Sequence, residues 1–137
     1  MRVGIVFFPG NERDSLLSVS KGLAKGIESQ GHQVDIIDGE HDVNTKLTIY
    51  KYLVIGATGS GSMGGRIPDK IAPYLSSSGM ISGKKSFAFI LKKGLRLTKT
   101  LRELMAAMEH EGMFVKFSEI LSSPEEAEAI GKRLHIE

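Results

Sequence analysis

The chain has 137 residues, with 18 Lys and Arg, 16 Asp and Glu, and a formal charge of +2. Because 41% of the residues are hydrophobic, we expect one globular domain over residues 1–137 with a buried core. Cys is absent, which excludes disulfides, thiolate zinc sites, CxxC redox motifs and Cys nucleophiles. No apolar run approaches the roughly 18 residues of a membrane span, and the run after Met1 is too short for a signal peptide. We therefore expect a cytoplasmic protein with no membrane contact.

Short apolar runs mark the strands of the first half of the chain. They cover Arg2–Phe8, Val34–Ile37 and Tyr52–Ile55. The run Arg2–Phe8 is nearly continuous, which is typical of a parallel strand that is buried on both faces. The segment His41–Tyr50 is polar, and we expect a loop with a brief helical turn there.

A helix is predicted from Ser15 to Gln30, because apolar residues recur there at helical spacing, at Leu16, Val19, Leu23 and Ile27. Asn11 or Asp14 can cap its start, and Gly31 supplies a left-handed stop. Two glycines inside the helix speak against it, since each costs about 1 kcal/mol relative to Ala.

A glycine-rich stretch, 59–65, leads into the second half of the chain. A short helix is expected to begin with Pro73 at its first position and to end near Gly79. The run Phe87–Leu91 predicts a fourth strand. The next helix is expected to have an inner face formed by Leu97, Leu101, Leu104, Met105 and Met108.

The signals at the ends of the last elements are more specific. Thr100 and Glu103 have capping-box spacing for the helix after the fourth strand, and Gly112 is its expected stop. A fifth strand is predicted over Phe114–Leu121. The final helix has Ser123 as its cap, followed by Pro124 at the first helical position and Glu126 at the third, which completes a capping box.

Alternation of strands and helices predicts an α/β fold, a three-layer sandwich around a five-stranded parallel sheet. In such sheets ligands bind beyond the carboxyl ends of the strands, at the point where the strand order reverses. Three loops are therefore candidate site segments: Pro9–Ser15, Ala57–Arg66 and Lys92–Leu97.

The sequence resembles the flavodoxins over nearly its whole length. The pieces that carry the resemblance occur in the right order, and they are Gly10-Asn11, Ala24–Ser29, Leu53–Gly56, Ser82–Lys85 and Ser123–Ala127. The resemblance implies the sheet order 2-1-3-4-5, a non-covalently bound FMN, and a role as an electron carrier or redox domain. It also implies an electron-transfer or binding protein rather than a stand-alone catalyst.

Two features depart from the flavodoxin pattern. The phosphate loop of flavodoxins is rich in threonine, whereas here Glu12 and Asp14 stand in that loop and threonine is absent. Flavodoxins commonly flank the flavin ring with Trp or Tyr, whereas the corresponding loops of this chain offer only Met63, Leu95 and Leu97.

The resemblance nevertheless implies a set of cofactor-binding positions. The backbone N–H groups from Gly10 to Arg13 would hold the FMN phosphate at a helix N-terminus. The other positions would contribute polar contacts or line the flavin ring, so that the full expected set is Pro9, Gly10, Asn11, Arg13, Ser15, Thr58, Gly59, Ser60, Gly94 and Leu95.

The charges are unevenly distributed along the chain. Residues 59–102 hold nine Lys or Arg and one acid, a net charge of +8. Lys92, Lys93 and Arg96 in this segment are expected at the ligand edge, where they would attract an acidic redox partner or another acidic protein. An alternative function is therefore a flavin-free flavodoxin-fold binding or interaction module, whose basic edge recognises an acidic partner or an anionic ligand.

Other motifs are weaker. The stretch 59–64 satisfies G-x-G-x-x-G, and Lys92 has a charge suited to an NADP 2′-phosphate, so a dinucleotide site stays open as a third alternative. The four His are isolated, and we expect no metal site. We also expect no nucleic-acid binding, because aromatic residues are not interleaved with the basic segment.

Overall fold

The computed structural model describes residues 1–60 and 63–137. Its five strands are β1 (Arg2–Phe8), β2 (Gln33–Asp38), β3 (Tyr52–Ala57), β4 (Lys85–Leu91) and β5 (Phe114–Leu121). Its four helices are α1 (Arg13–Glu28), α2 (Ile71–Ser76), α3 (Leu97–His110) and α4 (Pro124–Arg133).

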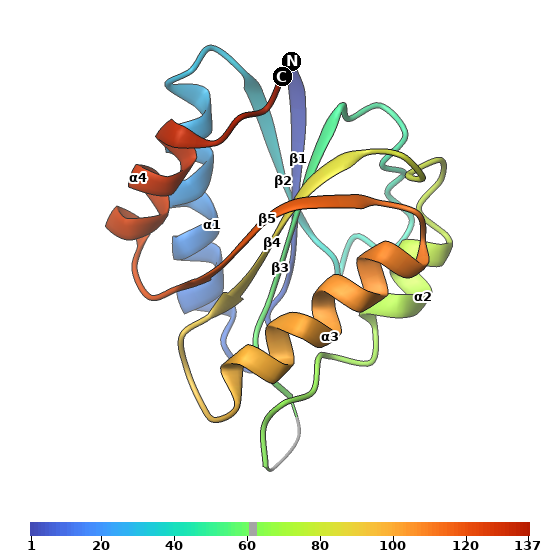
Figure 1. Ribbon diagram of the computed structural model, residues 1–137, viewed down its shortest axis with the longest axis vertical. Helices are drawn as coiled ribbons and strands as arrows, with labels where there is room; N and C mark the ends of the chain where they lie inside the picture. Colours follow the sequence, from blue (N-terminus) through green and yellow to red (C-terminus); the bar gives the residue numbers. More distant parts are fainter. Residues whose placement is uncertain (61–62) are drawn as a thin grey trace.

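The strands form one parallel sheet in the order β2-β1-β3-β4-β5, which confirms the predicted fold class and strand order. Helices α1 and α4 cover one face of this sheet, and α2 and α3 cover the other (Figure 1). The N- and C-termini both lie at the top of the view in Figure 1. No helix in the described parts of the chain is long and apolar enough to span a bilayer.

The sheet is buried because its central strands are almost entirely apolar. All residues of β3, and all but the first of β1 and β4, are buried. Their side chains alternate between two cores, one under α1 and α4 and one under α2 and α3. The predicted stripe of α1, which includes Leu16 and Leu23, faces the first core. The inner residues predicted for α3, which include Leu104 and Met108, face the second.

Close helix packing explains the two glycines inside α1. A Cβ on Gly22 would lie 2.3 Å from the carbonyl oxygen of Pro124, and a Cβ on Gly26 would lie 2.2 Å from that of Glu128. Both contacts are far shorter than van der Waals distances, so only glycine lets the backbones of α1 and α4 approach this closely. The intrinsic cost of glycine in a helix is offset by this packing.

Two predicted helix starts are wrong. Pro73 is the third residue of α2 rather than the first, because the helix already begins at Ile71. A proline fits there, since the first N–H groups of a helix have no partner within it. Thr100 lies inside α3 rather than at its cap, because this helix begins at Leu97. Its hydroxyl donates to the carbonyl oxygen of Arg96 instead.

Other predicted caps are confirmed in part. The Ser123 hydroxyl accepts from the N–H of Glu126, as predicted, while the Glu126 carboxylate accepts from the N–H of Ser122 rather than from that of Ser123. Gly31 and Gly112 adopt the left-handed conformation after α1 and α3, as predicted. Neither Asn11 nor Asp14 caps α1: that position belongs to Glu12, which makes no side-chain capping hydrogen bond.

Candidate functional site

The segments after β1, β3 and β4 leave the sheet at the same edge, because all the strands are parallel (Figure 1). The first joins β1 to α1 through residues 9–12, the second joins β3 to α2 through residues 58–70, and the third joins β4 to α3 through residues 92–96. Together they form the carboxyl edge at which the sequence predicts a ligand site.

The first two of these segments are joined by hydrogen bonds at their bases. The Thr58 hydroxyl donates to the carbonyl oxygen of Pro9 at 2.9 Å, and the Thr58 N–H donates to that of Phe8 at 3.3 Å. Gly10 follows with a φ of 54°, and a Cβ there would lie 3.3 Å from the Thr58 hydroxyl oxygen. Thr58 therefore fixes the turn that leads toward α1.

The third segment contacts both of the others. Lys93 Nζ forms an ion pair with Glu12 Oε2 at 2.6 Å, which joins it to the start of α1. The backbone at Gly64 packs against Leu95, since a Cβ on that glycine would lie 2.4 Å from the Leu95 carbonyl oxygen. All three segments are thus brought together, as the fold argument predicts.

The remaining predicted positions lie around this meeting point. Ser15 and Asn11 border a cavity of about 320 Å³ at the start of α1. The Ser60 N–H donates to the carbonyl oxygen of Arg66, while Gly59 and Gly94 are exposed. The Leu95 side chain is 67% exposed, an unusual position for a large apolar residue.

Arg13 points away from the loops and toward the end of β2. Its Nε lies 3.1 Å from Asp38 Oδ2, and its guanidinium lies over the Phe7 ring. Arg13 was predicted to contact the phosphate, but in the structure it is paired with Asp38 instead.

Carboxylates from the end of β2 also reach the first loop, and sequence reasoning missed them. The Gly10 N–H, which the FMN hypothesis assigns to the phosphate, donates to Glu40 Oε2 at 3.1 Å. The Asp38 carboxylate accepts from the N–H of Glu40 at 3.0 Å and lies 2.9 Å from His41 Nδ1. The sequence did contain a signal for them: Asp38 ends a parallel strand and Glu40 follows it, at the edge where ligands bind.

Asp38 stays ionised because of these contacts. Burial by itself raises the pKa of a carboxyl group, but the Glu40 N–H, the His41 ring and the Arg13 guanidinium together outweigh it. The pKa of Asp38 therefore lies below its ordinary value. The end of β2 thus carries a fixed negative charge beside the start of α1.

The first loop offers hydrogen-bond donors that suit an anion, but the Glu40 carboxylate competes for one of them. Gly10 points its N–H at a carboxylate, so the loop already accepts a negative group from elsewhere in the chain. Glu12 is neutralised by Lys93, and Asp38 by Arg13. A phosphate therefore fits this loop only where Glu40 has moved aside.

The basic edge has cations without acidic partners. Among the described residues, no carboxylate lies within ion-pair distance of Lys92 or Arg96, and both side chains are exposed. Arg96 has a φ of 54°, the left-handed conformation, and stands at the start of α3.

The G-x-G-x-x-G stretch is described only in part, since Gly61 and Ser62 lie outside the described residues. The next helix, α2, begins at Ile71 and not at the glycines. The dinucleotide alternative stays a prediction. In the parts of the chain that the structure covers, no three His, Asp or Glu side chains are grouped as metal ligands would be.

No family model matches the sequence, and no curated protein matches it. Solved structures are similar over almost the whole chain. Oxidised Flavodoxin 1 from Bacillus cereus is 16% identical, with a TM-score of 0.73 over 98% of this chain and 100% of its own. The flavodoxin of Streptococcus pneumoniae TIGR4 is 14% identical, with a TM-score of 0.72 over 98% of this chain and 97% of its own.

A longer protein is also similar over part of its length. The flavodiiron protein from Giardia intestinalis is 13% identical, with a TM-score of 0.70 over 97% of this chain and 35% of its own. Identities this low establish the fold alone. The chain is thus an α/β protein of the flavodoxin-like fold.

Proposed function

We propose that this flavodoxin-like protein binds FMN non-covalently at the carboxyl edge of its sheet and carries electrons between partners. The meeting of the segments after β1, β3 and β4 carries the proposal. Thr58 bonds to Pro9, Lys93 pairs with Glu12, and Leu95 packs against the backbone at Gly64. Bound FMN would supply the electron chemistry, and the protein would hold and tune it.

Energies decide whether Glu40 prevents phosphate binding. Its contact with Gly10 is exposed to solvent and is a single hydrogen bond from an N–H group to a charged acceptor. A hydrogen bond from an N–H group to a charged acceptor contributes about 1.5–3 kcal/mol. A phosphate dianion carries a larger charge than the carboxylate and can accept from more than one N–H group of the loop, so it has the advantage, although repulsion by the withdrawn carboxylate lowers the affinity.

The roles of the remaining positions follow from their places. The N–H groups of Gly10, Asn11 and Arg13 and the side chains of Asn11 and Ser15 would face the phosphate. The N–H of Glu12 instead donates to the carbonyl oxygen of Pro9 at 2.8 Å. Thr58, Gly59 and Ser60 would line one side of the flavin ring, and Gly94 and Leu95 the other. Leu95 offers an apolar surface in place of an aromatic side chain.

A matched pair of variants tests the proposal. FMN fluorescence is titrated with the protein, and saturable quenching is expected. Leu95→Asp places a charge beside the ring and should weaken binding at least tenfold, whereas Met80→Asp, at a residue that is also largely exposed, should change nothing. Absence of quenching by the unmodified protein, or equal effects of the two substitutions, would contradict the proposal.

A second candidate function is a flavin-free binding module that recognises an acidic partner. It is favoured by the Glu40 carboxylate on the Gly10 N–H and by Lys92 and Arg96, two exposed cations for which the described part of the chain supplies no acidic partner. In this case the protein's own carboxylate permanently fills the anion position, and the basic edge is the functional surface.

Poly-L-glutamate is a suitable probe for the second candidate. Serine substitutions at Lys92, Lys93 and Arg96 together should abolish its binding at low salt. The matched control replaces three exposed lysines at other places, which are Lys21, Lys51 and Lys85. If both triple variants lose binding equally, only overall charge matters and the second candidate is rejected.

A further inference from the structure

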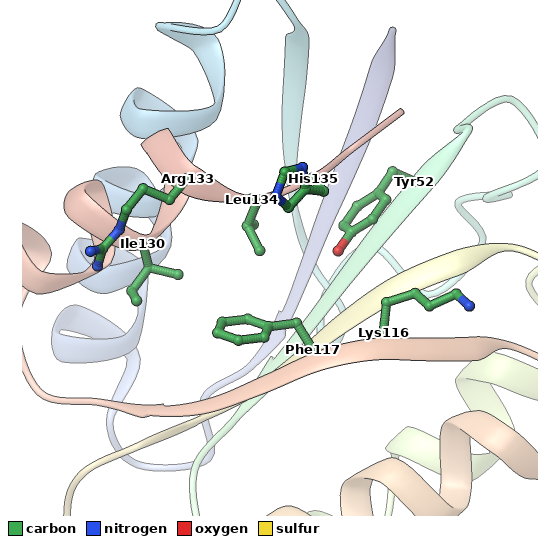
Figure 2. A pocket seen from close by; sticks show the side chains of 7 residues that line it. All are labelled: Tyr52, Lys116, Phe117, Ile130, Arg133, Leu134 and His135. Carbon is green, nitrogen blue, oxygen red and sulfur yellow. The ribbon is translucent and has the colours of Figure 1, made fainter.

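A second cavity lies far from the carboxyl edge, on the face of the sheet that α1 and α4 cover. It has a volume of about 220 Å³ and is enclosed by the start of β3, the middle of β5, and the end of α4 with the segment after it (Figure 2). Tyr52, the first residue of β3, marks its position at the amino end of the sheet. None of the residues proposed for FMN borders it.

The walls of this cavity are mainly apolar. Phe117 of β5 is stacked on Phe87, with 5.3 Å between the ring centroids, yet 43% of the residue stays exposed. Ile130 of α4 is half-buried, and Leu134 after α4 is buried. Figure 2 shows these side chains around a common space. Exposed aromatic surface beside such a hollow favours an apolar ligand.

One polar group is directed into the cavity. Tyr52 is 1% exposed, and among the described residues no group hydrogen-bonds to its hydroxyl. Figure 2 shows that hydroxyl pointing into the space between Leu134 and Phe117. Burial raises the pKa of Tyr52 to about 12, so the hydroxyl keeps its proton at neutral pH. Within residues 1–60 and 63–137 this donor has no acceptor.

The rim of the cavity is basic. Lys116, Arg133 and His135 border it, and no acidic residue is among the residues that line it. The charged ends of Lys116 and Arg133 point outward on opposite sides in Figure 2. Both residues are exposed, so their side chains can change rotamer on the nanosecond timescale and reach a ligand at the opening.

We propose that this cavity binds a small aromatic carboxylate. The ring would lie between Phe117, Ile130 and Leu134, and the carboxylate would accept a hydrogen bond from Tyr52 while facing the basic rim. Size limits the ligand: a cavity of about 150 Å³ holds benzene, so the present volume suits a molecule of about nine non-hydrogen atoms. Benzoate has this size and charge.

The test is a titration of the ¹⁵N-labelled protein with benzoate, followed by two-dimensional NMR. Saturable shifts are expected at Tyr52, Phe117 and Leu134, with a millimolar dissociation constant. Benzyl alcohol and benzylamine, which are neutral and cationic, should bind progressively more weakly. Equal binding of the three compounds would show that the basic rim plays no role, and this would overturn the proposal. Benzoate shifts at Gly10 and Gly94 instead would place the anion at the carboxyl edge, which would overturn it as well.

Two variants assign the role of the tyrosine. Tyr52→Phe should weaken benzoate binding about three- to tenfold, the loss expected for one hydrogen bond. Tyr74→Phe is the matched control, because Tyr74 is also buried with a hydroxyl that has no partner among the described residues, but lies in the core on the other face. Equal effects of the two variants would refute a direct contact.

A third variant tests whether the ligand occupies the cavity itself. Ile130→Trp places a larger side chain in the cavity and should abolish binding, and retained binding would overturn the proposal.

Discussion

Replacing Glu40 by Gln changes a single charge beside the proposed phosphate position. In the structure Glu40 Oε2 lies 3.1 Å from the Gly10 nitrogen, so a phosphate on that N–H must displace it. Glutamine keeps the size of the side chain and removes the charge. We expect Glu40→Gln to tighten FMN binding.

The size of the effect follows from Coulomb's law. A carboxylate that has withdrawn to about 7 Å repels a phosphate dianion by about 1 kcal/mol in water. Loss of this repulsion corresponds to a five- to tenfold tighter dissociation constant at low salt. At physiological ionic strength the Debye length is about 8 Å, so the gain should fall to about twofold.

Fluorescence titrations with FMN and riboflavin measure this effect. Riboflavin lacks the phosphate, so Glu40→Gln should leave its affinity unchanged. The control Glu28→Gln removes an exposed acid at the other end of α1 and should change neither affinity. If Glu40→Gln leaves FMN affinity unchanged, or tightens riboflavin equally, the phosphate does not bind at Gly10.

Three further predictions concern stability. Gly26→Ala should lower the free energy of unfolding in urea by about 1–3 kcal/mol, because the added methyl overlaps the Glu128 carbonyl; an unchanged value would refute the close helix packing. The lowered pKa of Asp38 adds stability above the ordinary value of 3.8, and this contribution is lost as pH falls through the lower folded pKa. Asp38→Asn should therefore flatten the acid side of the stability curve, and an unaltered curve would contradict this. Lys93→Gln should cost less than about 1 kcal/mol, since its pair with Glu12 is exposed; a larger loss in urea unfolding would show a structural role.

Much of the fold could be predicted because its signals are local. Buried parallel strands are written as continuous apolar runs, and Arg2–Phe8 was predicted with its observed bounds. The start of α4 could be predicted for the same reason, since Ser123 and Pro124 act within one turn. The strand order came from the resemblance to flavodoxins, not from these local patterns.

Helix starts were predicted less well where one residue type suits several positions. Pro73 fits anywhere in the first turn of a helix, so the sequence does not distinguish its first position from its third. Thr100 has capping-box spacing relative to Glu103, but it is fully buried inside α3. Its burial depends on the sheet beneath and is not visible in the local pattern.

The features of the site that could not be predicted depend on contacts between residues far apart in the sequence. The three loops could be selected from the topology of parallel sheets alone. The contact between Gly10 and Glu40 joins residues 30 apart, and the glycines of α1 are explained only by α4, about a hundred residues later in the chain. Such pairings depend on how the layers pack, which a single sequence does not specify.

The most direct test of the flavin site is a two-dimensional NMR titration of the ¹⁵N-labelled protein with FMN. We expect saturable shifts at the amides of Gly10, Thr58, Gly94 and Leu95, with Tyr52 and Phe117 unaffected. Shifts that are absent throughout, or that appear only at the amino end of the sheet, would show that the carboxyl edge does not bind FMN.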